Sequence, residues 1–179
     1  MIPAMSRGET PITAIIFVIN LVLWIVLLYI KKVPWKISLL AFAAGLAFIM
    51  AFMDGVATID KIQLSKGDDM LNGMYIMVQK INWWASAAWA IFIFVLLARK
   101  PWAQVVGLGA GLMASIGGYL LALVNMQETG RFSMFAPSPL LSTALIIVLL
   151  LPSTRALLAW WASGQQPEVL EPIPAVATG

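Results

Sequence analysis

The stretch PITAIIFVINLVLWIVLLYI, residues 11–30, contains no charged residue, and Lys31 and Lys32 follow it directly. A helix of about 20 residues extends for about 30 Å, which matches the hydrocarbon core of a bilayer. No small-residue cleavage site follows the stretch, so it is not typical of a secretory signal peptide. It is therefore predicted to remain in the protein as a membrane-spanning helix.

Four further stretches are long and apolar enough to cross a bilayer. They run over residues 34–59, 81–98 and 101–124, and from residue 137 onward. Pro152 interrupts the last stretch. It either kinks a span that continues to Trp161 or ends a span whose continuation, RALLAWWA, lies along the membrane surface. The predicted fold is an all-α membrane protein, a bundle of five transmembrane helices made of two helical hairpins and one further span.

The composition also indicates a membrane protein. Of the 179 residues, 61% are hydrophobic and 11% are charged, and the mean hydropathy is +0.93. A soluble domain has about 25% charged residues. The helical bundle is predicted over residues 11–161, after a short segment of residues 1–10. Residues 162–179 are rich in proline and lack periodicity, which predicts a disordered tail.

The distribution of charge predicts the orientation in the membrane. One side carries six basic residues in tight turns or at span ends, namely Lys31, Lys32, Lys36, Arg99, Lys100 and Arg155, whereas the other side mixes bases and acids. Basic turns face the cytoplasm, so residues 1–10 are predicted to be extracytoplasmic and the tail cytoplasmic, in the plasma or inner membrane. The formal net charge of +3 does not indicate a nucleic-acid partner.

Small residues recur every four positions in the span over residues 101–124, which is predicted to lie at the centre of the bundle. The two series are Gly107, Gly111 and Ser115, and Ala110, Ala114 and Gly118, with a smaller patch at Ala41 and Gly45. This spacing lets helix backbones approach closely inside a membrane. The series are interpreted as packing faces within the bundle, and the alternative is that one face receives a helix of a partner protein.

Two polar residues lie inside predicted spans. Asp54 follows Lys36 by eighteen residues, or about 27 Å of helix, which places it close to the outer headgroups. There it can stay hydrated or pair with Lys61 or Lys80, and the alternative is a proton-carrying or cation-binding role. Asn20 follows Pro11 by nine residues and should lie near the bilayer midplane, where an interhelical hydrogen bond is the favoured interpretation.

The segment of residues 60–80 is predicted to contain an amphipathic helix capped by Asp68 or Asp69. This helix either lies on the outer surface or leads into the next span. Its methionines, Met70, Met74 and Met77, share a predicted face and would suit Cu(I), although methionine also fills irregular apolar contacts.

The turns KKVPW (residues 31–35) and RKPW (99–102) are alike, which is consistent with duplicated hairpins or with convergence at basic turns.

The functional prediction follows from what the sequence lacks. It contains no Cys and no His, which excludes thiolate metal sites, imidazole-ligated haem and His-based catalysis. The chain is predicted to be a non-catalytic accessory or assembly subunit of a larger membrane complex, without cofactor or metal and with lipid and other membrane subunits as partners. One alternative is a small transporter or channel whose path is lined by Asp54, Asn20 and Tyr119. Another is a lipid or quinone pocket lined by Trp24, Trp89 and Phe92.

Overall fold

The computed structural model describes residues 9–30, 33–65, 67–129 and 137–164. Every element in this part of the chain is helical, which agrees with the predicted all-α class. The elements are α1 (Glu9–Ile25), the π-helical turn η1 (Val26–Ile30), α2 (Trp35–Leu64), α3 (Asp69–Leu97), α4 (Ala103–Thr129), α5 (Pro137–Leu150) and α6 (Pro152–Ala162). Most of the predicted N-terminal segment and of the predicted tail lies outside the described residues.

Three helices, α2, α3 and α4, are long and apolar enough to cross a membrane. The pair α5 and α6 would provide a fourth crossing if its two bent parts form one span. The apolar part of the first helix, over Phe17–Tyr29, is shorter than these. The structure therefore supports an integral membrane protein with several spans, whereas the count of five and the orientation stay predictions.

The break at Pro152 separates α5 from α6. Leu151 is extended, with φ −61° and ψ 135°, and the two helices are bent by 73° relative to each other. Pro152 begins a new helix because its missing N–H cannot continue the hydrogen bonding of the old one. The indole Nε1 of Trp161 donates to the carbonyl oxygen of Leu96 at 2.7 Å, and the Arg99 guanidinium lies 4.1 Å from the centre of the Trp161 ring. Helix α6 is thus attached to the end of α3.

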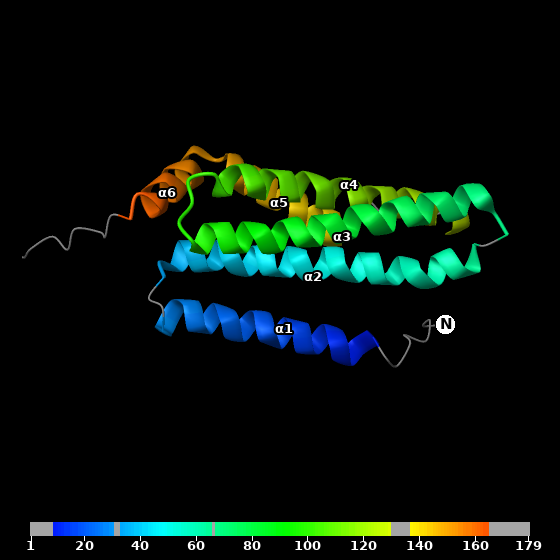
Figure 1. Ribbon diagram of the computed structural model, residues 1–179, viewed down its shortest axis with the longest axis horizontal. Helices are drawn as coiled ribbons and strands as arrows, with labels where there is room; N and C mark the ends of the chain where they lie inside the picture. The colour runs from blue at the N-terminus through cyan, green and yellow to red at the C-terminus, as the bar shows by residue number, and fades with distance from the viewer. Residues whose placement is uncertain (1–8, 31–32, 66, 130–136, 165–179) are drawn as a thin grey trace, which may run out of the picture.

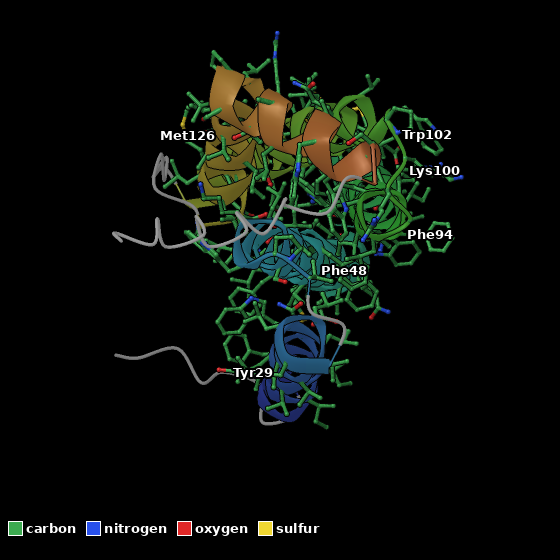
Figure 2. All side chains as sticks on the ribbon, turned by 90° about the vertical axis from the view of Figure 1, so that its left-hand side faces the viewer. Tyr29, Phe48, Phe94, Lys100, Trp102 and Met126 are labelled. Atoms are coloured by element: carbon green, nitrogen blue, oxygen red, sulfur yellow. The ribbon has the colours of Figure 1, made fainter. Side chains whose placement is uncertain are left out.

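The helices α2, α3, α4 and α5 form an antiparallel bundle, and α1 packs chiefly on α2 at its edge (Figure 1). Viewed along the bundle, α1 lies apart from the other helices (Figure 2). The largest fully buried side chains come mainly from α3, among them Trp89 and Phe92, whose rings meet edge to face at 5.6 Å. The sequence predicts the span over residues 101–124, which is α4, at the centre of the bundle. In the structure the central position is instead that of α3, and α4 lies between α3 and α5.

The small residues singled out in the sequence are all buried inside this bundle, namely Gly107, Gly111, Ser115, Ala110, Ala114, Gly118, Ala41 and Gly45. A Cβ atom at Gly107 would overlap Phe92 of α3 and Leu149 of α5, and one at Gly118 would overlap Pro139. The hydroxyls of Ser115 and Thr143 are 3.1 Å apart. The close approach of α4 to α3 and α5 thus uses these small residues within the chain itself.

Helices α2 and α3 are longer than a bilayer is thick. They have 30 and 29 residues, or about 45 Å of helix each against about 30 Å of hydrocarbon. At one end of the bundle, interfacial residues such as Trp35, Lys100 and Trp102 mark the membrane surface. The opposite ends of α2 and α3 are therefore expected to extend beyond the hydrocarbon. We call the part of the bundle towards these ends the projecting head, comprising residues 55–64 of α2, 69–82 of α3 and 118–129 of α4.

The predicted amphipathic helix over residues 68–81 is the first half of α3. It continues without a break through Asn72 and Gly73, so it leads into a span and does not lie flat on the membrane surface. The Asp68 carboxylate caps it by accepting a hydrogen bond of 3.0 Å from the backbone N–H of Leu71. Tyr75, Val78 and Val124 form a separate small core in the projecting head.

We expect Gly107→Ala to lower the free energy of unfolding by about 1–3 kcal/mol, because the added methyl group would push against Phe92 and Leu149 in a close-packed contact. The matched control is Gly109→Ala in the same helix, where a Cβ atom would meet nothing within 4 Å. Thermal unfolding of the purified proteins in detergent would measure both. Equal effects at the two positions would contradict the close packing of α4.

Candidate functional site

Four helices meet at one level of the bundle, and three of them, α2, α3 and α5, contribute a polar side chain there. Each pair of neighbouring helices meets there through adjacent residues: Asp54 lies beside Ser138, Gly55 beneath Trp83, Asn82 against Gly117, and Gly118 against Pro139. These four contacts run from α2 to α3, α4 and α5 and back to α2, so they form a closed ring. We call this ring the polar layer. It separates the main apolar core from the small core of the projecting head.

Several polar groups at or near the polar layer lack a hydrogen-bond partner. Asn82 is fully buried, and neither the oxygen nor the nitrogen of its amide is bonded to any described residue. The Ser138 hydroxyl lies near the Asp54 carboxylate, but the two groups do not form a regular hydrogen bond, and Ser142 is also unbonded within the described chain. A buried amide without a partner costs about 1–3 kcal/mol, so such a group calls for an explanation.

Other hydroxyl groups of this region are satisfied by their own helices. Thr58 donates to the carbonyl oxygen of Gly55 at 2.6 Å, and Ser86 donates to that of Trp83 at 2.9 Å. Both bonds are the local type that serine and threonine make inside helices. At and beside the polar layer, the buried side chains that lack a hydrogen-bond partner among the described residues are therefore those of Asn82, Ser138 and Ser142.

The polar layer is expected to lie near the edge of the hydrocarbon. Asp54 follows Trp35 by nineteen residues, or about 28 Å of helix. Trp83 and Trp84 are exposed at the same level, and tryptophan is typical of membrane–water interfaces. This depth suits a partly hydrated carboxylate, and Asp54 is indeed only half-buried. Its pairing with Lys61 or Lys80 stays a prediction.

Asn20 lies elsewhere and has a different role. Its Nδ2 donates to the carbonyl oxygen of Phe42 at 3.3 Å, and its side chain packs on Gly45. The adjacent contact of Trp24 with Phe42, at 5.2 Å between ring centres, also joins α1 to α2. Asn20 therefore forms an interhelical contact that holds α1 to the bundle.

Two residues of the predicted transport path, Asn20 and Asp54, are not brought together. Gly45, on which Asn20 packs, precedes Asp54 by nine residues, or about 14 Å along α2. The predicted lipid or quinone pocket is divided in the same way. Trp89 and Phe92 are buried against each other in the main core, whereas Trp24 packs on α2.

The projecting head exposes large apolar side chains. Leu64 and Met70, on either side of the turn between α2 and α3, have 82% and 74% of their surface exposed. Met77 and Met126 are also exposed, whereas Met74 packs against the small core of the head. The three methionines considered for Cu(I) therefore differ in their surroundings. Within the described residues, no group of acidic side chains could hold a metal ion either.

No known family model, no curated protein and no solved structure matches this chain. Sequence reasoning overlooked Asn82, Ser138 and the exposed Leu64. A signal for Asn82 existed, because it is an amide within a long apolar stretch, as Asn20 is.

The two asparagines should respond oppositely to the same substitution. We expect Asn82→Leu to raise the free energy of unfolding by about 1–3 kcal/mol, because it removes an unsatisfied buried amide. We expect Asn20→Leu to lower it by about 0.6–2 kcal/mol, because it removes an interhelical hydrogen bond. Chemical unfolding in detergent would test both. Destabilisation by Asn82→Leu would show that the amide has a partner, such as a bound water or solute.

Proposed function

We propose that this chain is a non-catalytic accessory or assembly subunit of a larger membrane complex, and that the projecting head binds its partner. The observation that carries the proposal is the exposure of Leu64 and Met70 at the tip of the head. Leu64 lies ten residues beyond Asp54, or about 15 Å farther from the hydrocarbon. Lipid chains do not reach these side chains there.

An exposed apolar side chain has different surroundings in the membrane-spanning part of the bundle than in the head. Phe94 and Val105 are also highly exposed, but they lie in the spanning parts of α3 and α4, where lipid chains cover them. Leu64 and Met70 would instead face water, where each buried Å² of apolar surface is worth about 25 cal/mol. Exposed apolar groups of this kind are typical of protein-binding surfaces, and flexible methionines suit such contacts.

Helix α1 is compatible with the same proposal, although lipid chains would cover its exposed residues equally well. Its contact with the rest of the chain runs along one side, through Asn20 and Trp24, while apolar residues around the rest of its circumference are exposed: Ile15, Phe17, Val18, Ile19, Val22, Leu23 and Ile25. Such a helix offers a partner's helices a wide surface within the bilayer. A path for a transported solute has weaker support, because Asn20 and Asp54 lie apart along α2.

We expect the double variant Leu64→Gln with Met70→Gln to release the chain from its complex. The measurement is the native mass of the chain after mild-detergent extraction from its own membrane. The wild-type chain should migrate together with other proteins, in an assembly much larger than its own 19.5 kDa. The double variant should migrate alone. The matched control is Lys80→Gln, an exposed polar change in the same head. A solitary wild-type chain would overturn the proposal.

A further inference from the structure

An open groove lies between α2, α5 and the first turns of α6. Its volume is about 410 Å³, within the range of ligand sites in proteins. The α2 wall is formed by Leu39, Leu40 and Ala43, and the α5 wall by Leu145 and Val148. The groove lies where α5 ends and the chain turns by 73° into α6. Leu39 and Val148 are partly exposed at its edges, so the groove is open towards the lipid.

The polar groups of the groove are gathered at one end. Lys36 is the only charged residue that lines it, and Ser153 and Thr154 add two hydroxyl groups from the first turn of α6. Trp35, beside Lys36, also lines the groove and is mostly exposed. Because tryptophan and lysine at a helix start are typical of the membrane surface, this polar end lies at the depth of the lipid headgroups.

The end of the bundle that contains the groove is uniformly basic. Lys36, Arg99, Lys100 and Arg155 all lie there, and the described chain has no acidic residue at this end. In α2, α3 and α4 and the turn between α2 and α3, the described acids are Asp54 at the polar layer and Asp60, Asp68, Asp69 and Glu128 in or next to the projecting head, at the opposite end. A one-sided positive charge at the membrane surface attracts anionic lipids.

We propose that this groove binds one anionic phospholipid of the surrounding membrane. An acyl chain lies between Leu39, Ala43 and Val148, and the headgroup phosphate lies against the Lys36 ammonium. The hydroxyls of Ser153 and Thr154 donate hydrogen bonds to the phosphate oxygens. Apolar walls with a basic group at the membrane surface are the arrangement by which pockets between transmembrane helices hold anionic lipids. This inference concerns a different surface from the projecting head and does not depend on the proposed partner.

The test is a lipid titration of the purified full-length chain in detergent, followed by native mass spectrometry. The two lipids are phosphatidylglycerol and phosphatidylcholine with identical acyl chains. We expect one molecule of phosphatidylglycerol to bind more tightly than phosphatidylcholine. In Lys36→Gln, binding of phosphatidylglycerol should weaken about five-fold, the factor that corresponds to roughly 1 kcal/mol for one lysine near anionic lipid. Binding of phosphatidylcholine should not change.

Two controls make the test specific. Lys100→Gln removes a charge from the same end but outside the groove, so it should leave both affinities unchanged. Ala43→Phe fills the groove and should weaken both lipids, with circular dichroism to confirm that the variant is folded. Equal losses in Lys36→Gln and Lys100→Gln would overturn the proposal in favour of diffuse charge attraction. Displacement of the lipid by millimolar inorganic phosphate would overturn it in favour of a free-anion site.

Discussion

The close approach of α4 to α3 and α5 is the contact on which the rest of the bundle depends. In a bilayer, apolar side chains gain little by leaving lipid for protein, so helices associate through tight packing over small residues. Gly107, Gly111 and Gly118 provide this packing by admitting Phe92, Ile146 and Pro139 to the backbone of α4. Gly117 does the same for Asn82. Because these contacts fix the register of α3, α4 and α5, they also help to fix where the polar layer forms.

The second constraint is the mismatch between helix length and membrane thickness. Helices α2 and α3 are longer than the hydrocarbon core is thick by about 14 Å each, so they are expected to project on the side away from the basic turns. The core of the protein divides at this boundary, with the polar layer between its two parts. The surroundings of an exposed side chain are expected to differ on the two sides of this boundary. Val105 would contact lipid, whereas Leu64 would contact water or a partner.

The sequence predicted the helical class and apolar spans from residues 34 and 101, close to the starts of α2 at Trp35 and α4 at Ala103, because these follow from apolar length. The depth of Asp54 stays a prediction. The sequence also identified the small residues of α4, since their spacing is local. It did not predict that Ser138 would lie beside Asp54 or that Asn82 would be buried without a partner. Those facts depend on the register between helices far apart in the sequence. The sequence does not decide between a kinked span and a surface helix after Pro152, because proline fixes the break but not the direction of the following helix, which the structure bends by 73°.

The central proposal for this protein is that the tip of the projecting head lies outside the hydrocarbon and is covered by a partner. The chain has no cysteine, so Leu64→Cys and Lys80→Cys can each be labelled singly with a membrane-impermeant maleimide in permeabilised preparations. The account predicts that Cys at residue 64 reacts in proteoliposomes of the purified chain but is protected in the native membrane, while Cys at residue 80 reacts in both. Equal reaction of residue 64 in both preparations would contradict a partner on the head. No reaction in either would contradict its position outside the membrane.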